Sequence, residues 1–492
     1  MNVDHILKII KKQHNVLDIV DLGELSESPG KAYHFFNKNY KDTYANNDRI
    51  VIYTQHTVPA NLVKHILDTI NFIDIDSFFI LFCTPQSIHD ILDKIPNNKF
   101  QNKIIPIKNS KEIQTRYYIP QDTFCAIPWN NIEIRQDGSI DPCCMSKNHA
   151  LGHITNTKIS DAFNNEKMQE LRTSLISGIK HPACTICWQR EEKNLTSIRQ
   201  HNAKRLKQQF LTQLVDEPKI TSLDIKFNNT CNFSCLICNP GASSMRAIED
   251  QKFKNIPIKP IVNWSDSENF LTQVNDLLPN LQNIDMYGGE PFLIKKFKNV
   301  LKTAVEKGYA KNIRLHYNSN GSIWPDSFID YWPYFKQVDI HFSIDAVGKQ
   351  FEYQRGGSWS DVDENIQRIK NLQIPNMSIN IMPAISILNV YYFDQVVDWA
   401  IEKDFSIFES HVITPSGFSI TNLTKSAKEL IFNKYKNYDK WPKMKDIIDT
   451  LSRSKDSDGK DFIKEISYFD RARNRNFADD HEEIAIAMGY KL

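Results

Sequence analysis

Three cysteines on one short segment carry the clearest chemical information in this chain of 492 residues. Cys231, Cys235 and Cys238 have a CxxxCxxC spacing and follow a strand-like run at residues 223–227. Three thiolates on one loop can hold three irons of a cubic 4Fe–4S cluster and leave the fourth iron open for a small molecule. A structural zinc site needs four ligands, and only three cysteines are local here. The segment therefore favours an iron–sulfur cluster with one free coordination site.

Five further cysteines form a second cluster upstream of this segment, at residues 125–187. Gly138 and Cys143 have a GxxxxC spacing, and Cys184 and Cys187 form a CxxC pair. Four thiolates at such spacing suit an iron–sulfur cluster or a zinc ribbon. The five cysteines are Cys125, Cys143, Cys144, Cys184 and Cys187. One cysteine of the adjacent pair at 143 and 144 is then spare, and the sequence does not say which.

The tetrapeptide Gly288-Gly289-Glu290-Pro291 follows a second apolar run, about fifty residues after the first three cysteines. Together with those cysteines it resembles the radical S-adenosylmethionine (SAM) enzymes. The resemblance implies that Cys231, Cys235 and Cys238 hold the SAM-binding cluster and that the Gly288–Pro291 turn holds the methionyl amine. The family usually has an aromatic residue near the adenine where this chain has Ile237, and an aliphatic side chain can still pack on a purine.

The upstream cysteines resemble the twitch domain, a shortened relative of the SPASM domain of radical SAM enzymes. The resemblance implies that four of them are ligands of one auxiliary 4Fe–4S cluster. These are Cys125, Cys143, Cys184 and Cys187. Twitch domains usually follow the barrel, whereas this unit precedes it, at residues 119–190.

Strands and helices alternate over residues 218–420, which fits an open, partial (β/α)6 TIM-like barrel within an α/β chain. The expected strands are at 223–227, 283–287, 312–317, 338–343, 377–382 and 405–411. Active sites of such barrels lie at the carboxyl ends of the strands. The Cys231 segment and the Gly288–Pro291 turn both fall at such ends, which independently supports the assignment.

The rest of the chain adds three regions. Residues 1–118 alternate strands (50–53, 78–82, 103–107) with helices (60–70, 87–94), which predicts a small α/β domain. This domain is either a docking or substrate-presenting module or a scaffold, and Cys83 within it is expected to be a buried small hydrophobe. Residues 191–217 are expected to be a helical linker, and residues 421–492 a helical region that caps the barrel.

Local signals predict the structure of the cysteine-rich unit. Asp137-Gly138 lies between two short strand-like runs and predicts a hairpin. Ser160 is expected to be the N-cap of a helix running to about residue 176, with Gly178 ending it.

Several polar residues at strand ends are candidate SAM contacts or catalytic groups. Asn320, Ser343 and Asp345 resemble family turns that contact the ribose and methionyl parts, and Arg355 could pair with the carboxylate. His341 shares a strand face with Ser343, and Glu409 is expected to share one with His411. His341, Glu409 and His411 are candidate substrate contacts or proton acceptors, because polar groups inside a barrel cost free energy unless they are used or paired. Ordinary turn, cap or surface roles are the alternative for each.

Composition narrows the class of protein. The net charge is +1, so no overall field favours a nucleic acid or a membrane. The first residues lack the plan of a signal peptide, and the longest apolar run, near residues 78–82, is too short to cross a bilayer. We therefore expect a cytoplasmic protein in which nine cysteines favour metal ligation over disulfides.

The resemblance implies reductive cleavage of SAM to a 5′-deoxyadenosyl radical, which abstracts hydrogen from a substrate. A flavodoxin- or ferredoxin-like donor would supply the electron, and the auxiliary cluster would accept one from the substrate. The leading hypothesis is oxidation or crosslinking of a peptide or protein side chain. The alternatives are a dehydrogenase or rearrangement enzyme acting on a small sugar- or nucleotide-like metabolite, and a non-catalytic iron–sulfur or zinc scaffold.

Overall fold

The computed structural model divides the chain into two compact units, residues 1–121 with 207–217, and residues 122–206 with 218–492. The structure describes four strands of the first unit and most of the second. The described residues are 16–21, 49–53, 81–83, 104–106, 122–192, 196–205, 217–258, 263–411 and 416–490. Within them no helix is long and apolar enough to cross a membrane.

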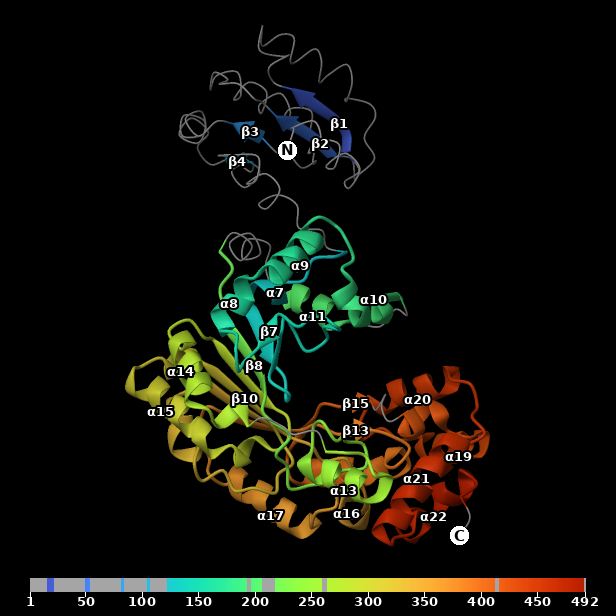
Figure 1. Ribbon diagram of the computed structural model, residues 1–492. Coiled ribbons are helices and arrows are strands. Elements are labelled where there is room, and N and C mark those ends of the chain that lie inside the picture. Colours follow the sequence, from blue (N-terminus) through green and yellow to red (C-terminus); the bar gives the residue numbers. More distant parts are fainter. Residues whose placement is uncertain are drawn as a thin grey trace. The chain divides into compact units, whose positions relative to one another are not determined.

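The described part of the first unit is a parallel sheet with strand order β1-β2-β3-β4 (Figure 1). Its strands are Val16–Asp21, Arg49–Tyr53, Leu81–Cys83 and Ile104–Pro106. The first of these strands is one that the sequence pattern did not indicate. The helices expected at 60–70 and 87–94 lie outside the described residues. Cys83 ends β3.

The second unit is built on a nine-stranded sheet with the order β14-β12-β11-β10-β9-β8-β5-β6-β7. Parallel strands β8 to β12 and β14 form the expected partial barrel (Figure 1). Their bounds are Ser222–Lys226, Asn283–Tyr287, Arg314–Ser319, Gln337–Phe342, Met377–Ile381 and Ser406–Ile407. The sixth expected strand is broken in two, because β15 (Ser410–His411) pairs with β13 (Ala384–Ile385) instead of continuing β14.

The barrel strands alternate apolar and polar residues. In β8, Leu223 and Ile225 are fully buried, and in β9 so are Ile284 and Met286, while the residues between them are only half-buried. The apolar face packs under the outer helices α14 (Glu268–Leu277), α15 (Lys298–Glu306) and α17 (Trp359–Lys370) (Figure 1). The polar residues therefore point to the inner face of the barrel.

The cysteine-rich residues extend the same sheet. β5 (Asn131–Ile134) pairs in parallel with β8, and it forms the expected hairpin with β6 (Ser139–Asp141), which continues to the short β7 (Gly152–His153). Gly138 turns the hairpin with a φ of 89°. The sequence order suggested a separate unit ahead of the barrel, whereas strand pairing joins the two.

The helix expected from Ser160 to about residue 176 is two helices. α8 (Ile159–Asn164) begins after Lys158, and α9 (Glu166–Ile176) begins after Asn165. Asn165 is the N-cap of α9, because its side-chain oxygen accepts a hydrogen bond from the Met168 amide at 2.9 Å. The N-cap expected at Ser160 is therefore wrong. α10 (Thr185–Glu192) and α11 (Ile198–Arg205) follow, and residues 206–216 of the expected linker lie outside the described residues.

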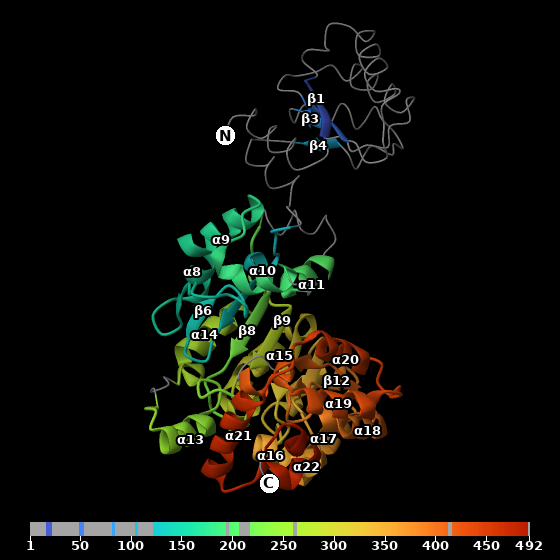
Figure 2. The ribbon, with the colours of Figure 1, turned by 90° about the vertical axis from the view of Figure 1, so that its right-hand side faces the viewer.

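The described residues of the C-terminal region contain four α-helices. They are α19 (Lys425–Tyr435), α20 (Met444–Arg453), α21 (Lys460–Arg473) and α22 (Phe477–Ala487). Their apolar side chains pack with Ile387 and Val390 from the loop after β13 in one buried cluster. The Tyr353 hydroxyl of α16 (Gly348–Arg355) donates to Asp470 of α21 at 2.7 Å. Figure 2 shows α21 and α22 beside α16.

Candidate functional site

The three clustered cysteines lie on the loop between β8 and α13 (Ser244–Lys254). Two serines at the start of the helix shape this loop. The Ser243 hydroxyl donates to the Phe233 carbonyl at 2.6 Å, and the Ser244 hydroxyl lies 3.1 Å from both the Cys231 amide and the Cys231 carbonyl oxygen. These bonds tie the end of the loop, at residues 243–244, to its beginning at residues 231–233 without any contribution from a metal.

The Gly288-Gly289 turn presses against the same loop. Both glycines have positive φ, 75° and 54°. A Cβ on Gly289 would lie 2.2 Å from the Thr230 carbonyl oxygen, closer than any side chain can approach. The Glu290 amide donates to that same carbonyl at 2.8 Å. Only glycine therefore fits at this contact between the turn and the cysteine loop.

The Glu290 side chain ties the turn to the end of β10. The carboxylate is fully buried and accepts hydrogen bonds from the Phe292 amide (3.2 Å), the Ser319 hydroxyl (2.9 Å) and the Asn320 amide (2.7 Å). Burial raises the pKa of Glu290 to about 7, although these bonds oppose the rise. The Asn320 side-chain amide in turn points to Cys231, with Nδ2 3.9 Å from Sγ. Glu290 and Asn320 thereby reach the cysteine loop.

Arg355 and Asp345 form a buried ion pair beside a second cysteine. Arg355 Nε lies 2.9 Å from Asp345 Oδ2, and Arg355 Nη1 lies 3.7 Å from Cys235 Sγ. Asp345 Oδ1 accepts from the Ala384 amide at 2.7 Å. The structure brings these two predicted SAM contacts together with Cys235, and the contacts themselves stay predictions.

The remaining predicted cofactor contacts border this centre. The Ser343 amide donates to the Ser319 carbonyl at 2.9 Å, which places Ser343 beside the end of β10. Pro291 is buried at the start of the short helix η4 (Pro291–Leu293). Ile237 packs on the apolar cluster of the C-terminal helices. Their roles toward a cofactor remain predictions.

The donor set of this loop suits an iron–sulfur cluster. Burial raises the pKa of Cys231 to about 11 and that of Cys238 to about 12, so both thiols stay protonated at neutral pH unless a cation binds them. Arg355 supplies positive charge beside Cys235. Three soft donors on one loop, with charge and amide groups aimed at their sulfurs, fit a cluster held by three thiolates.

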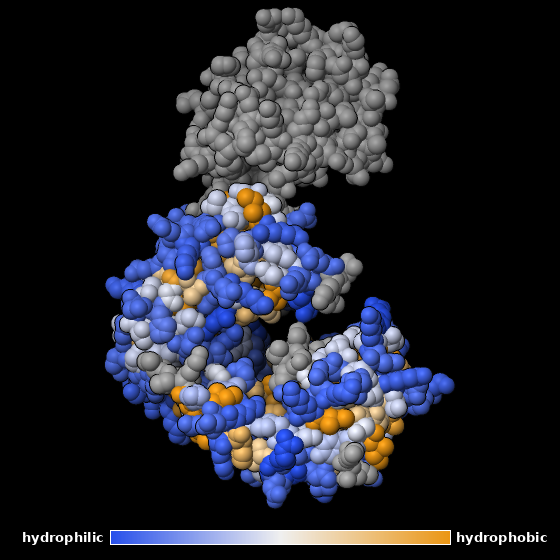
Figure 3. Space-filling model, turned by 45° about the vertical axis from the view of Figure 1, so that its right-hand side comes forward, coloured by the Kyte–Doolittle hydropathy of each residue, from blue (hydrophilic) through white to orange (hydrophobic). Residues whose placement is uncertain are grey.

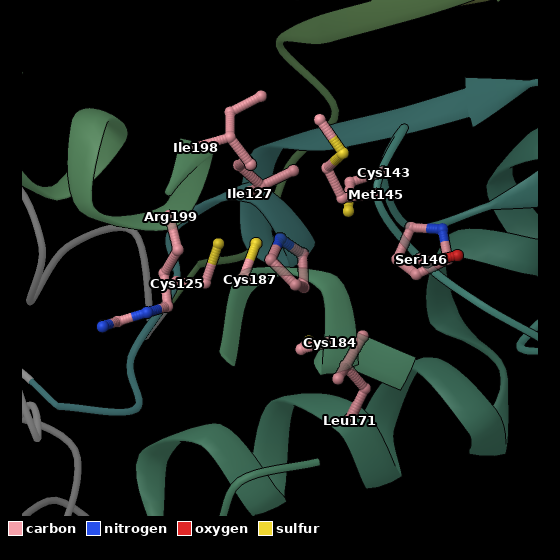
Figure 4. Close-up of a pocket in the computed structure, with 12 residues that line it drawn as sticks. Cys125, Ile127, Cys143, Met145, Ser146, Leu171, Cys184, Cys187, Ile198 and Arg199 are labelled. Carbon is pink, nitrogen blue, oxygen red and sulfur yellow. The ribbon is translucent and has the colours of Figure 1, made fainter. Parts of the chain in front are cut away.

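Four upstream cysteines surround one cavity (Figure 4). Cys125 precedes α7 (Ile127–Asn130), Cys143 follows β6, and Cys184 and Cys187 come from η2 (Pro182–Cys184) and α10. The rest of the lining is largely apolar and includes Ile127, Leu171 and Ile198. In the described part of the chain no three His, Cys, Asp or Glu side chains converge closely enough to hold a single metal ion. The cavity with its four thiols fits an auxiliary cluster.

The adjacent residues Cys143 and Cys144 have different surroundings in the structure. Cys143 lines the cavity, whereas Cys144 does not belong to the lining. Burial raises the pKa of Cys144 to about 12, and the neighbouring charges that act on it are those of Asp224, Glu133 and Lys226. Cys144 thus lies near the polar inner face of the sheet. The expected ligand set of Cys125, Cys143, Cys184 and Cys187 is the set that the fold brings together.

A row of titratable residues, which the sequence analysis missed, crosses the inner face of the sheet. Glu133 of β5, Asp224 of β8, Asp285 of β9 and His316 of β10 are successive cross-strand partners. Lys226 Nζ lies 2.6 Å from Glu133 Oε1. The row therefore runs from the cysteine-rich part into the barrel. Polar residues at alternate positions of these strands were the available signal, but the row depends on register between strands.

His316 and Asp285 form a hydrogen-bonded pair within this row. His316 Nδ1 lies 2.9 Å from Asp285 Oδ1. Because a carboxylate only accepts, Nδ1 carries the proton and Nε2 is left as an acceptor. Nε2 is buried without a hydrogen-bond partner among the described residues. The pair therefore offers a preoriented proton acceptor inside the barrel.

His341, a predicted catalytic residue, packs against this pair. The His341 ring lies 4.5 Å from the His316 ring, centroid to centroid, and stacks on Phe408 at 5.7 Å. Burial and the neighbouring His316 lower the pKa of His341 to about 4, so the ring is neutral at pH 7. The fold places His341 beside the His316–Asp285 pair, and a catalytic role for it stays a prediction.

Glu409 and His411 do not share a strand face. Glu409 lies between β14 and β15, and its Oε2 is 3.0 Å from Lys443 Nζ. His411 ends β15, and its side chain lies outside the described residues. The expectation of a common face is wrong because the strand breaks between them.

Two family profiles match the chain. The profile of the radical SAM superfamily matches residues 225–400, and that of the SPASM domain, an iron–sulfur cluster-binding domain, matches residues 125–188. No curated protein matches the chain.

Several solved structures match part of the chain at low identity. They include anSMEcpe with bound AdoMet (18% identity, 48% of this chain and 63% of that chain, TM-score 0.34). They also include Streptococcus suis SuiB bound to S-adenosylmethionine (14%, 58% and 65%, TM-score 0.32). A third is SuiB bound to the precursor peptide SuiA (12%, 58% and 65%, TM-score 0.32). The chain spans less than two thirds of the length of these neighbours.

The fold, the two cysteine sites and the profiles define the class. Residues 225–400 form a radical SAM domain, and residues 125–188 form a SPASM-type iron–sulfur domain that precedes it in the chain. The cofactors of the chain are a 4Fe–4S cluster with SAM and auxiliary iron–sulfur.

Proposed function

We propose that this protein is a radical SAM oxidoreductase that oxidises or crosslinks a peptide or protein side chain. The observation that carries the proposal is the continuous sheet, with the three-cysteine loop at one strand and the four-cysteine cavity beside another. β5 and β8 are direct neighbours, so a polar inner face extends between the two sites. A substrate on that face would be within reach of both.

The open shape of the second unit supports a chain-like substrate. Figure 3 shows this unit hollowed between its cysteine-rich part and its C-terminal helices, with hydrophilic residues lining the hollow. An open groove admits a segment of polypeptide, whereas small metabolites are usually enclosed. The separate first unit, residues 1–121, offers a further module that could hold such a substrate.

When bound, the first cluster with SAM supplies hydrogen-atom abstraction from an unactivated carbon, and the auxiliary cluster supplies a one-electron acceptor. Residues of the chain would bind and orient SAM and exclude water. Gly289 and Glu290 fix the turn expected to hold the methionyl amine, and Arg355 is the candidate partner of the carboxylate. The apolar lining around Cys125 and Cys187 keeps water from the auxiliary site.

A two-electron oxidation that begins with loss of a hydrogen atom also releases one electron and one proton. We assign the proton to His316 Nε2. Asp285 holds the ring in the tautomer that leaves this nitrogen free. The neutral His341 ring contacts the His316 ring on the same inner face of the barrel.

The proposal is tested with His316→Gln in anaerobically reconstituted protein. Candidate peptides encoded near the gene are offered with deuterium at side-chain carbons. We expect wild-type protein to move deuterium into 5′-deoxyadenosine and to yield a peptide lighter by two hydrogens. The variant should form product about 100-fold more slowly, the usual contribution of a general base, and still cleave SAM.

The control is His201→Gln, which changes an exposed histidine on α11 and should leave turnover unchanged. Normal product formation by His316→Gln would remove the proton-acceptor role. Labelled nucleotide sugars tested in parallel decide between the substrate classes, because deuterium transfer from a sugar and none from peptides would favour the small-metabolite alternative.

A further inference from the structure

Three polar residues form a row across the inner face of the barrel. They are Asn318 of β10, His341 of β11 and Asn380 of β12, which are register partners on three neighbouring strands. Partners in a parallel sheet point to the same face, so the three side chains lie next to one another. All three residues are half-buried. The row therefore presents two carboxamides and one imidazole to the interior of the barrel.

Two atoms of this row are buried without a hydrogen-bond partner. Neither Asn318 Oδ1 nor His341 Nδ1 has a partner among the described residues. A buried polar atom without a partner costs free energy, and native proteins contain few of them. Because Asn318 and His341 lie at the same level of the sheet, one bound group could satisfy both atoms.

The carboxylates next to this row already have partners. Asp285 Oδ1 lies 2.9 Å from His316 Nδ1, and Asp339 forms an ion pair with Arg314. Neither carboxylate is therefore available to hold a cationic ligand. The His341 ring adds no charge at pH 7, because burial lowers its pKa to about 4. The row thus suits an uncharged group that both donates and accepts hydrogen bonds.

An aromatic ring packs against one side of the row. Phe408 is 46% exposed, and its ring stacks on the His341 ring with centroids 5.7 Å apart and planes 8° apart. The Phe408 amide donates to the Ile381 carbonyl at 2.8 Å, which fixes its backbone to β12. A flat ligand group could pack on this ring while it bonds to the polar atoms beside it.

The row also lies close to the predicted SAM contacts. Asn320 and Ser343 follow two residues after Asn318 and His341. Residues of a strand rise about 3.3 Å each, so the row lies about 7 Å deeper in the barrel than those contacts. A substrate held at the row would therefore have its neighbouring atoms next to the SAM site.

We propose that the row of Asn318, His341 and Asn380 binds a backbone peptide group of the substrate. Phe408 packs against the plane of that group. A peptide group is uncharged and flat, and its N–H donor and carbonyl acceptor match carboxamide and imidazole side chains. The inference rests on the proposed function and names the part of the substrate that the barrel recognises.

The test uses Asn318→Leu, which replaces the carboxamide by an apolar group of similar size. Binding of the candidate peptides encoded near the gene is measured by calorimetry on the reconstituted, SAM-loaded full chain without a reductant. We expect the dissociation constant to rise at least about ten-fold, because the bound peptide group loses a partner. The melting temperature without peptide should stay the same or rise, because the variant lacks a buried polar atom without a partner. A purely structural role for Asn318 would lower it instead.

Asn380→Leu is the second variant and should weaken peptide binding in the same way. Asn275→Leu is the matched control. Asn275 Oδ1 is also buried without a partner in the described part of the chain, but it lies on the outer helix α14. This substitution should leave peptide affinity unchanged.

Peptides with one N-methylated backbone amide identify the bound group. One of them should bind wild-type protein more weakly than the unmodified peptide does, and Asn318→Leu should not distinguish the two. If every N-methylated peptide binds wild-type protein as the unmodified peptide does, the row holds no backbone peptide group.

The inference is overturned if no candidate peptide binds wild-type protein, or if both row variants bind peptide as wild type does. A loss of SAM affinity in Asn318→Leu would assign the row to the cofactor. Binding of nucleotide sugars that is lost in the row variants would assign it to a small metabolite. Failure of the proposed function is distinct, because a peptide that binds through the row without deuterium transfer to 5′-deoxyadenosine would contradict only the reaction.

Discussion

At the scale of single residues, the two adjacent cysteines give a sharp prediction. Cys143 lines the four-cysteine cavity and Cys144 does not. We expect Cys143→Ala to lower the iron content of reconstituted protein from about eight to about four per chain, and Cys144→Ala to keep about eight. Iron and sulfide analysis with low-temperature paramagnetic resonance checks this. Loss of iron in Cys144→Ala alone would reverse the assignment.

Gly289 gives a second prediction at this scale. Gly289→Ala would force a Cβ to within 2.2 Å of the Thr230 carbonyl, so the turn must move off the cysteine loop. We expect a loss of SAM affinity of at least ten-fold and a destabilisation of about 2–4 kcal/mol. Calorimetric SAM titration and thermal unfolding measure the two effects.

Gly308→Ala is the matched control for Gly289→Ala. Gly308 also has a positive φ, 73°, but an added Cβ meets nothing within 4 Å. The free energy of unfolding of this variant should fall by about 1 kcal/mol, the cost of a left-handed backbone conformation for alanine, and its SAM affinity should be unchanged. Equal effects of the two variants would show that backbone strain, and not the contact with Thr230, governs the site.

At the scale of elements, α21 supports the cysteine loop through one side chain. Arg473 lies 2.7 Å from Glu249 of α13 and also donates to the Ser234 carbonyl within the loop. Arg473→Gln leaves the largely buried Glu249 with Arg246 as its remaining arginine partner. We expect a destabilisation of about 1–3 kcal/mol and faster loss of the first cluster to a chelator.

Arg453→Gln serves as the comparison for this helix contact. Its side chain is 82% exposed, and its ion pair with Asp449 is long, at 4.0 Å. The substitution should therefore have little effect on stability or on the rate of cluster loss. If Arg473→Gln retained both clusters as long as Arg453→Gln does, α21 would have no role in holding the loop.

At the scale of the whole molecule, a buried histidine links stability to pH. His481 is fully buried among the rings of Tyr353, Tyr392 and Phe477, and burial lowers its pKa to about 3. The unfolded chain takes up a proton near pH 6.5 and the folded protein does not. Stability is therefore full above that pH and falls as the pH drops toward 3.

The expected loss at His481 is about 2 kcal/mol between pH 7 and pH 5. His481→Leu removes the titrating group, so its stability should fall less over the same interval by about that amount. Thermal unfolding of both proteins at the two pH values, without oxygen, measures the difference. Parallel pH dependence in the two proteins would mean that other groups dominate.

Short stretches of the sequence predict much of the fold and part of the candidate site. The CxxxCxxC spacing, the Gly288–Pro291 turn and five of the six barrel strands are local features, and they predicted the class of protein and the fold of the barrel. They are readable because ligand spacing, glycine turns and strand alternation each involve only neighbours along the chain.

The remaining features could be established only from the tertiary structure. Cys143 lines the cavity and Cys144 does not, and β5 pairs with β8 in one sheet. His316 is hydrogen-bonded to Asp285, and the last expected strand is interrupted between Glu409 and His411. Each of these depends on which strands become neighbours and in what register. That choice is made by the packing of distant segments, which no local pattern in the chain records.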